Sequence, residues 1–253
     1  AWTLQVGDIR NPAATLDEIF SYLRDAEKPC LVAIDEFQQI DKYEDRNVEA
    51  TLRTYIQYCS NAHFVFSGSQ RDMMGAIFTS SARPFYQSAT IMNLPPIKET
   101  KYAEFCRRHF AAAGKTLGDD VVPELYSRFD GTTFYLQKVM NILFMRTGSG
   151  EACTEGMIDD AVNYIIDFSS ETYGDLLYQL PEKQKLTLLA IAQEGKASGI
   201  TSGDFVSKYS LASPSSVSSA ANGLLDKGLV TCSRGVWRVY DLFFELWIRE
   251  RYL

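Results

Sequence analysis

Two adjacent carboxylates, Asp35 and Glu36, are the side chains of this sequence best suited to chemistry. They follow the short apolar run CLVAI, residues 30–34. A run this short and apolar throughout predicts a strand buried on both faces of a parallel sheet. Ligands of such sheets bind at the carboxyl ends of the strands, where these carboxylates would lie. There, one carboxylate can support a Mg²⁺ ion and the other can orient a water molecule and take its proton.

An apolar strand that ends in Asp-Glu is the Walker B arrangement, with Asp35 serving the Mg²⁺ of a nucleotide and Glu36 the attacking water. The pattern is short, so a strand that merely ends in acidic residues at a solvent-exposed loop is the alternative. A second apolar run, HFVFSGSQ at residues 63–70, favours the Walker B interpretation. It predicts a neighbouring strand that ends in the small polar residues Ser67 and Ser69, which would sense a γ-phosphate or hold the water.

The elements that must position these residues alternate between strands and helices. The predicted strands are 2–9, the run from residue 30, 63–67 and 88–94, and the predicted helices between them are 15–26 and 47–60. This alternation predicts a parallel α/β sheet. Further along, the apolar rhythm predicts helices at 99–113, 120–129, 133–146, 155–179, 183–193, 202–209, 214–227 and 241–252, with strand-like pieces at 229–233 and 236–240. We expect an α/β domain at 1–97, a helical lid at 98–180 and a winged-helix domain at 181–253.

A phosphate-binding loop is missing from the place where it is expected. The pattern G-x-x-x-x-G-K-[ST] should precede the Walker B strand, yet no glycine-rich loop with a lysine lies before Asp35. Gly114-Lys115-Thr116 matches the end of the pattern, but His109 stands at the first glycine and a helical segment precedes the triplet, so Gly114 is interpreted as a helix cap. We therefore expect the chain to be a fragment that hydrolyses ATP poorly or not at all.

The succession LVAIDEFQQI, FVFSGSQ, MNLPPI, a helical lid, a winged helix and the ending YDLFFELWIRERY resembles the prokaryotic "archaeal ATPase" group. These are P-loop ATPases in the neighbourhood of the AAA+ and STAND proteins, and the resemblance covers about residues 4–253. It implies a partial P-loop NTPase parallel sheet with a helical lid and a C-terminal winged-helix domain. It also implies ATP and Mg²⁺ as ligands of the full-length protein and a regulatory or signalling ATPase as its function.

The resemblance assigns a role to each matching residue. Asp35 matches the Mg²⁺-associated aspartate and Glu36 the catalytic acid, while Ser69, or less closely Ser67, matches the sensor. Gly131 and Thr133 belong to the segment GTTFYL, which matches the lid segment Gly-Gly-x-Pro-x-Tyr-Leu that approaches the nucleotide base.

The sequence also departs from the family pattern at three positions. Asp130 replaces the first glycine of the lid segment, Thr133 replaces its proline, and Ser88 stands where many relatives carry an arginine. Arg71 and Arg83 are the nearby candidates for stabilising a γ-phosphate. These departures leave open a slow or inactive enzyme.

The predicted winged helix opens an alternative function, that of a DNA-binding regulator whose α/β part is a scaffold. On the helix at 214–227, Val217, Ala220, Ala221, Leu224 and Leu225 are predicted to face inward, which leaves Ser215, Ser216 and Ser219 for DNA together with Arg234 and Arg238 of the wing. Residues 181–253 hold 9 Lys and Arg against 7 Asp and Glu. This mild excess also suits a winged helix that packs against or binds proteins, as in a non-catalytic interaction module.

Composition limits the remaining function classes. A net charge of −7 argues against a surface-wide basic coat for nucleic acid or anionic lipid. No apolar run approaches the roughly 18 residues of a membrane span. The 5 cysteines are odd in number and widely spaced, which disfavours a zinc site or a disulfide framework and predicts a cytoplasmic protein. A protein partner is expected, whereas the oligomeric state has no sequence signal.

Overall fold

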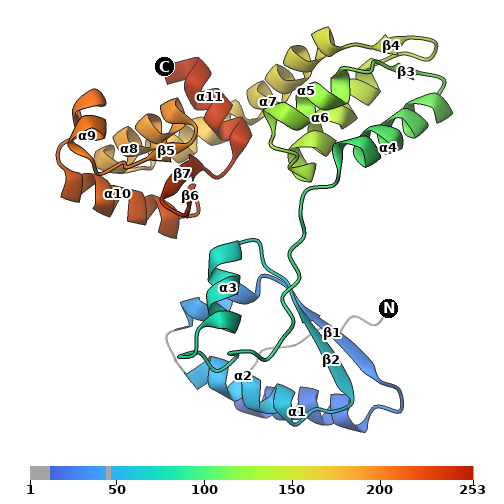
Figure 1. Ribbon diagram of the computed structural model, residues 1–253, viewed down its shortest axis with the longest axis vertical. Coiled ribbons are helices and arrows are strands. Elements are labelled where there is room, and N and C mark those ends of the chain that lie inside the picture. The colour runs from blue at the N-terminus through green and yellow to red at the C-terminus, as the bar shows by residue number, and fades with distance from the viewer. Residues whose placement is uncertain (1–11, 44–46, 253) are drawn as a thin grey trace. The chain divides into compact units, whose positions relative to one another are not determined.

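The computed structural model describes residues 12–43 and 47–252 and divides the chain into two compact units, Ala1–Asn93 and Leu94–Leu253 (Figure 1). Each unit is described by itself below. The predicted strand at 2–9 lies outside the described residues.

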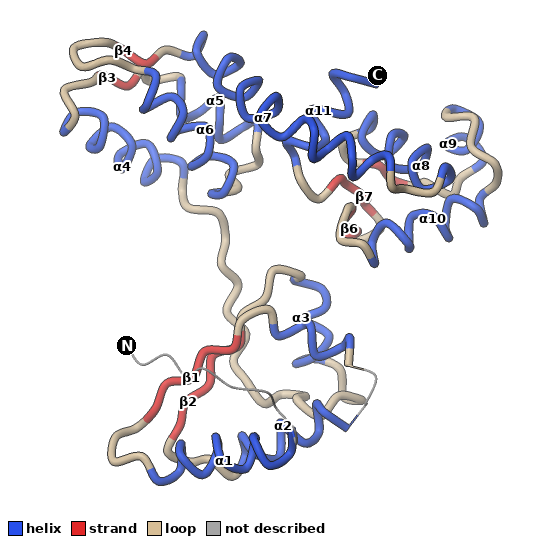
Figure 2. The backbone as a smooth tube through the Cα atoms, turned by 180° about the vertical axis from the view of Figure 1, so that it is seen from behind, coloured by secondary structure: helices blue, strands red, loops and turns tan. Residues whose placement is uncertain are grey.

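The first unit is built on two parallel strands, β1 (Cys30–Ile34) and β2 (Ala62–Phe66). They pair in register, with Cys30 opposite Ala62 and Ile34 opposite Phe66. Parallel strands need a crossover connection, which α2 provides here (Figure 2). The other elements of the described part of this unit are α1 (Pro12–Asp25), the 3₁₀ helix η1 (Phe37–Lys42), α2 (Asn47–Gln57) and α3 (Arg71–Thr79).

In the part of the chain that the structure describes, one face of this sheet is covered and the other is open, so the predicted strand is not buried on both faces. Burial alternates along both strands, and Leu31 on the open face is 74% exposed. The covered face packs in two clusters. One joins the strands to α1 and α2 around Phe20 and Phe64, and the other joins them to η1 and α3 around Phe37 and Phe66. The apolar run predicted the strand correctly but carried no information on how many layers cover it.

The third predicted strand, at 88–94, is wrong. Residues 88–98 form neither helix nor strand, and Ile91, Met92 and Leu94 are exposed (tan loop in Figure 2). A strand exists only through hydrogen bonds to a neighbouring strand, and among the described residues no strand pairs with this segment. Its β-branched residues and its terminal prolines therefore indicated an extended backbone but not a sheet.

Helix α3 was not predicted from the sequence. Its buried residues Ile77 and Phe78, with the partly buried Met74, follow the 3- and 4-residue spacing of an amphipathic helix. The segment is only 9 residues long, so this spacing repeats too few times to stand out from a loop.

The second unit is mostly helical, with a single buried core from Tyr102 on α4 to Ile248 on α11. Its strands form two small sheets, β3 parallel to β4 and the antiparallel order β5-β7-β6. Its elements are α4 (Glu99–Ala112), β3 (Thr116–Leu117), α5 (Val121–Arg128), α6 (Thr133–Arg146), β4 (Ala152–Cys153), η2 (Glu155–Met157), α7 (Ile158–Tyr178), α8 (Glu182–Glu194), β5 (Ala197–Ser198), α9 (Gly203–Lys208), α10 (Pro214–Asp226), β6 (Val230–Ser233), β7 (Val236–Val239) and α11 (Leu242–Tyr252).

This core crosses the boundary expected between a lid and a winged-helix domain, since α7 packs against α11. The division into 1–97, 98–180 and 181–253 stays a prediction. Within the described ranges 12–43 and 47–252, no helix is long and apolar enough to span a membrane.

Gly114 ends helix α4, as the sequence predicted. Its backbone is left-handed, with φ +69°, and the next amide, that of Lys115, donates to the carbonyl of Phe110 at 2.9 Å. The Lys115 ammonium donates to the carbonyl of Phe144 at 2.6 Å and lies 4.0 Å from the centroid of its ring. The triplet Gly-Lys-Thr therefore has a structural role in this helical unit.

Helix α10 begins and packs much as its sequence predicts. The Ser213 hydroxyl accepts a hydrogen bond from the Ser216 amide at 3.2 Å and caps the helix. Four of the five residues predicted to face inward are buried. Leu225 is the exception, because it is 41% exposed.

We predict that Leu224→Ala destabilises the second unit by about 2–5 kcal/mol, because the fully buried side chain leaves a cavity. The adjacent exposed position is the control, and Leu225→Ala should change stability by less than about 1 kcal/mol. Chemical denaturation followed by circular dichroism measures both variants. Equal losses would contradict this assignment of the α10 face.

Candidate functional site

Backbone pairing continues past the carboxyl ends of β1 and β2. The Ser67 amide donates to the Ile34 carbonyl at 2.9 Å, and the Phe37 amide donates to the Ser67 carbonyl at 2.9 Å. These two bonds hold Asp35 and Glu36 directly beside the residues that follow β2. The strand ends therefore bring together side chains that are more than 30 residues apart in the sequence.

Asp35 is held as a carboxylate by two donors. The Ser67 hydroxyl donates to its Oδ1 at 2.6 Å, and the Glu36 amide donates to the same oxygen at 2.9 Å. The Ser67 bond, followed by the amide bond, lowers the pKa of Asp35 below its ordinary value. Its Oδ2 has no hydrogen-bond partner in the described part of the chain.

Glu36 has a strained backbone and a tightly held side chain. Its φ of 50° and ψ of 41° lie in the left-handed region, which costs a residue other than glycine about 1–2 kcal/mol. The Ser69 hydroxyl donates to its Oε2 at 3.1 Å, and the side-chain amide of Gln38 donates to the same oxygen. The sequence named Ser69 and Ser67 as alternatives for one position, whereas each of them contacts a different carboxylate.

Gln38 was missed in the sequence, although it lies two residues after Glu36. It is 1% exposed, which is unusual for a glutamine. Its position in the sequence carried no signal, because a polar residue after a strand ordinarily faces solvent. Only the short 3₁₀ helix η1 turns it inward, beneath Gly68.

Arg83, one of the two candidate γ-phosphate arginines, is engaged in ion pairs inside the first unit. Arg83 donates to Asp41 at 2.5 Å and pairs with Glu49 at 2.8 Å, and both contacts raise its pKa against the opposing effect of burial. The side chain of Arg71 lies outside the described residues. Ser88 donates its hydroxyl to the carbonyl of Phe85 at 2.7 Å, as part of a local turn.

Gly131 and Thr133 belong to the second unit, whereas the carboxylates belong to the first. Gly131 is buried with φ +68°, and a Cβ at this position would overlap the ring of Tyr126. Thr133 is the half-buried first residue of α6. The left-handed backbone and the close approach of Tyr126 explain why a glycine stands at position 131. Contact of Gly131 or Thr133 with a nucleotide stays a prediction.

Arg238, a predicted DNA contact, is engaged inside the protein. It donates to Asp130 at 2.6 Å, and Lys196 pairs with the same carboxylate at 3.2 Å. These contacts outweigh burial and lower the pKa of Asp130. Arg234, in contrast, is exposed in the turn between β6 and β7.

The α10 serines lie beside a hollow of about 460 Å³. Ser215 and Ser219 are exposed and Ser216 is half-buried. The hollow is lined by Pro181, Lys183, Gln184, Ser213, Ser215, Ser216, Ser219 and Ala220. The structure therefore gathers the three predicted serines next to one lysine.

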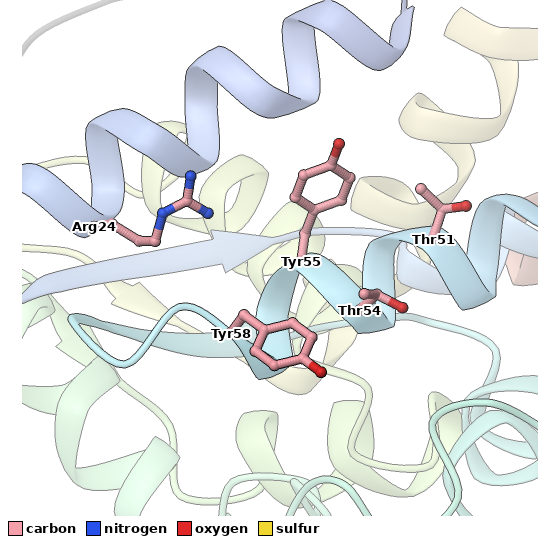
Figure 3. Close-up of a pocket in the computed structure, with 5 residues that line it drawn as sticks. All are labelled: Arg24, Thr51, Thr54, Tyr55 and Tyr58. Carbon is pink, nitrogen blue, oxygen red and sulfur yellow. The ribbon is translucent and has the colours of Figure 1, made fainter.

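A second hollow, of about 370 Å³, lies over helices α1 and α2 (Figure 3). Its Arg24 donates to Ser21 at 2.9 Å, and its Tyr55 donates to Asp17 at 2.5 Å. Its remaining lining residues are Thr51, Thr54 and Tyr58. Because its main polar groups already have partners, we assign it no chemistry.

Comparison with known proteins defines the class of fold. A family model described as a probable winged helix domain matches residues 171–250. The solved structure of the Walker-type ATPase PABY2304 of Pyrococcus abyssi is similar over 98% of this chain and 72% of its own, with a TM-score of 0.64 and 16% identity. The chain therefore has a mixed α/β, mostly helical architecture of the P-loop NTPase type, with a C-terminal winged-helix domain.

The other comparisons add less. The match to the structure of the RuvB Holliday junction branch migration motor of Thermotoga maritima covers 91% of this chain and 74% of the RuvB chain, with 12% identity. Its TM-score of 0.44 is too low to carry an argument. No curated protein sequence matches the chain.

We predict that Ser67→Ala raises the pKa of Asp35 toward its ordinary value, because the hydroxyl is the largest cause of the lowering. A ¹³C NMR titration of the aspartate carboxyl groups measures the change. Ser69→Ala is the control, since that hydroxyl contacts Glu36 and not Asp35. A similar shift in both variants would contradict the pairing described here.

Proposed function

We propose that this chain is the nucleotide-responsive part of an ATP-binding and ATP-hydrolysing protein. The observation that carries the proposal is the joint placement of Asp35 with Ser67 and of Glu36 with Ser69 at the carboxyl ends of adjacent parallel strands. The P-loop NTPase type of fold supports it. Ligands of such sheets bind at this edge.

The donor set at Asp35 fits a Mg²⁺ ion that arrives with a nucleotide. Mg²⁺ prefers oxygen ligands, and Asp35 offers an ionised carboxylate whose Oδ2 has no partner among the described residues, beside the Ser67 hydroxyl. In the described part of the chain, no three His, Cys, Asp or Glu residues gather to hold a metal by themselves. The remaining ligands would thus be phosphate oxygens and water, and the ion would neutralise charge on the phosphates.

Glu36 is proposed to act on the attacking water. Its Oε2 already accepts two hydrogen bonds, and its Oε1, which has no partner among the described residues, is the atom proposed to accept the proton. As water attacks the γ-phosphorus, the bond to the bridging oxygen of ADP breaks, and the proton of the water passes to Glu36. Ser69 orients the carboxylate from the neighbouring strand end.

The finer assignment follows the resemblance to the archaeal ATPase group and remains part of the proposal. We propose a regulatory or signalling ATPase in which Gly131 and Thr133 approach the base of the nucleotide. The turn that holds them is tied to the winged helix through Asp130 and Arg238, so a change at this turn would be felt in that domain. The winged helix would then present a surface to a protein partner.

The sequence contains no loop of the phosphate-binding type before the carboxylates. Because such a loop and its lysine normally cradle the phosphates, we expect the 253-residue chain to hydrolyse ATP poorly. Micromolar binding and turnover of Mg·ATP by this chain would show that it does not need the loop.

We predict that Glu36→Gln lowers kcat about 10²–10⁴-fold, because an amide cannot take a proton from water. The experiment uses the longest product of the gene that contains this chain, with ATPase assays and nucleotide titrations. Binding should stay within about two-fold, since the substitution preserves the size of the side chain. Glu27→Gln, at an exposed position before β1, is the control. Unchanged turnover in Glu36→Gln would remove Glu36 from its proposed role.

DNA binding is the second candidate function, favoured by the exposed serines and Lys183 around the α10 hollow and by the exposed Arg234. The ion pair of Arg238 with Asp130 counts against it, because that arginine would have to leave its partner.

If the wing binds DNA, Arg234→Ala should weaken binding to a short mixed-sequence duplex and reduce the salt slope by about 1. Arg238→Ala should have a smaller effect on the slope, because its charge is already neutralised by Asp130. Fluorescence anisotropy at several salt concentrations measures both variants. Binding by the unmodified chain that does not depend on salt would count against this candidate.

A further inference from the structure

We propose that Gln38 is a positioning residue that fixes the Glu36 carboxylate for proton transfer. The catalytic part of this inference rests on the proposed function. The contact itself, between the side-chain amide of Gln38 and the Oε2 of Glu36, can be tested without any turnover.

Burying the side-chain amide of Gln38 costs free energy, and no contact within its own helix η1 offsets this cost. A primary amide removed from water costs free energy unless its hydrogen bonds are replaced. Of the three other buried polar residues in the described part of the chain, Thr147 and Thr187 donate their hydroxyls to backbone carbonyls four residues earlier, and Glu245 lies 3.4 Å from Arg249. The side-chain nitrogen of Gln38 instead donates a hydrogen bond to the carboxylate of Glu36. The Oε1 of Gln38 has no partner in the described part of the chain. A buried oxygen without a partner is destabilising, so the contact with Glu36 is the feature that accounts for the position of this side chain.

Gly68 provides the space in which this amide lies. A Cβ at Gly68 would overlap the Oε1 of Gln38 and the side chain of Met74. The oxygen end of the amide therefore lies against the backbone between Ser67 and Ser69, and the nitrogen end faces Glu36. The reverse orientation would place Oε1 against a carboxylate oxygen, where two acceptors repel each other.

Gln38 and Ser69 constrain Glu36 differently. A serine hydroxyl rotates and can donate or accept, and Ser69 is exposed to solvent. The amide nitrogen of Gln38 only donates, and its side chain is enclosed by protein. Gln38 therefore fixes which oxygen of Glu36 is used as the acceptor, so that Oε1 is the one left for a proton. An oriented base of this kind is a recurring requirement of proton transfer in enzymes.

The functional test replaces Gln38 with methionine, which has a similar length and no donor. In the longest gene product, Gln38→Met should lower kcat about 10–100-fold, as the loss of a supporting hydrogen bond does at other sites, with KM and nucleotide binding within about two-fold. Gly68→Ala should lower kcat as well, because it displaces the amide without removing it. Gln39→Met, at the exposed neighbouring position, is the matched control and should match wild type.

The contact is tested by ¹⁵N NMR of side-chain amides in the 253-residue chain, with the Gln38 signals identified by their loss in Gln38→Met. Glu36→Ala should shift these signals and speed their exchange with water, and should leave those of Gln39 in place. If Glu36→Ala changes neither the chemical shifts of the Gln38 signals nor their exchange with water, the proposal is overturned. If Gln38→Met does not fold, as thermal unfolding would show, Gln38→Asn provides the same readout with a shorter amide.

The two arms separate the inference from the function on which it rests. Absence of ATP hydrolysis by the unmodified gene product, with Gln38 signals that respond to Glu36, would refute the proposed hydrolysis and leave the contact standing. Hydrolysis that Gln38→Met reduces no more than Gln39→Met would refute the positioning role and leave the proposed function standing.

Discussion

The candidate site depends on one interaction, the in-register parallel pairing of β1 with β2 and its continuation past both strands. The bonds from Ser67 to Ile34 and from Phe37 to Ser67 carry this register into the loops. A slip of one residue would turn every side chain of a strand to the other face. Asp35 and Glu36 would then lose their hydrogen bonds to Ser67 and Ser69, and only water would contact their carboxylates in place of these hydroxyls.

An aromatic cluster immediately behind the carboxylates supports this arrangement. The ring of Phe37 lies 4.5 Å from that of Phe66 and 5.2 Å from that of Phe85, measured between centroids. Aromatic pairs of this kind contribute about 0.5–1.5 kcal/mol beyond the burial of their surface. The residue next to Glu36 is thereby anchored in the core, which helps to offset the cost of the left-handed backbone at Glu36. Strain at a site persists only where the surrounding structure enforces it.

The second unit places its own polar network between its helices and its winged helix. The Tyr135 hydroxyl donates to the Tyr240 carbonyl at 3.2 Å and accepts from the Leu242 amide at 3.1 Å. The ion pair of Asp130 with Arg238 lies in the same region of the fold. The turn at Asp130 is thus joined to β7, and α6 to the start of α11, by directional bonds as well as by apolar packing. Such a junction suits a domain that responds to changes at the turn.

The sequence by itself determined most of the secondary structure and the two carboxylates. Apolar spacing is a local property, and it located β1, β2 and nearly all helices of the second unit to within a few residues. It failed at 88–94, because an extended backbone becomes a strand only when another segment offers hydrogen bonds.

Tertiary structure alone decided which side chains meet. The contacts of Ser67 with Asp35 and of Ser69 with Glu36 join segments more than 30 residues apart, and no local pattern specifies their partners. The burial of Gln38 and the engagement of Arg238 by Asp130 are likewise products of packing. A polar residue after a strand faces solvent or core according to the elements that cover it. The sequence therefore predicted a site with two carboxylates, and tertiary packing determined which side chains contact them.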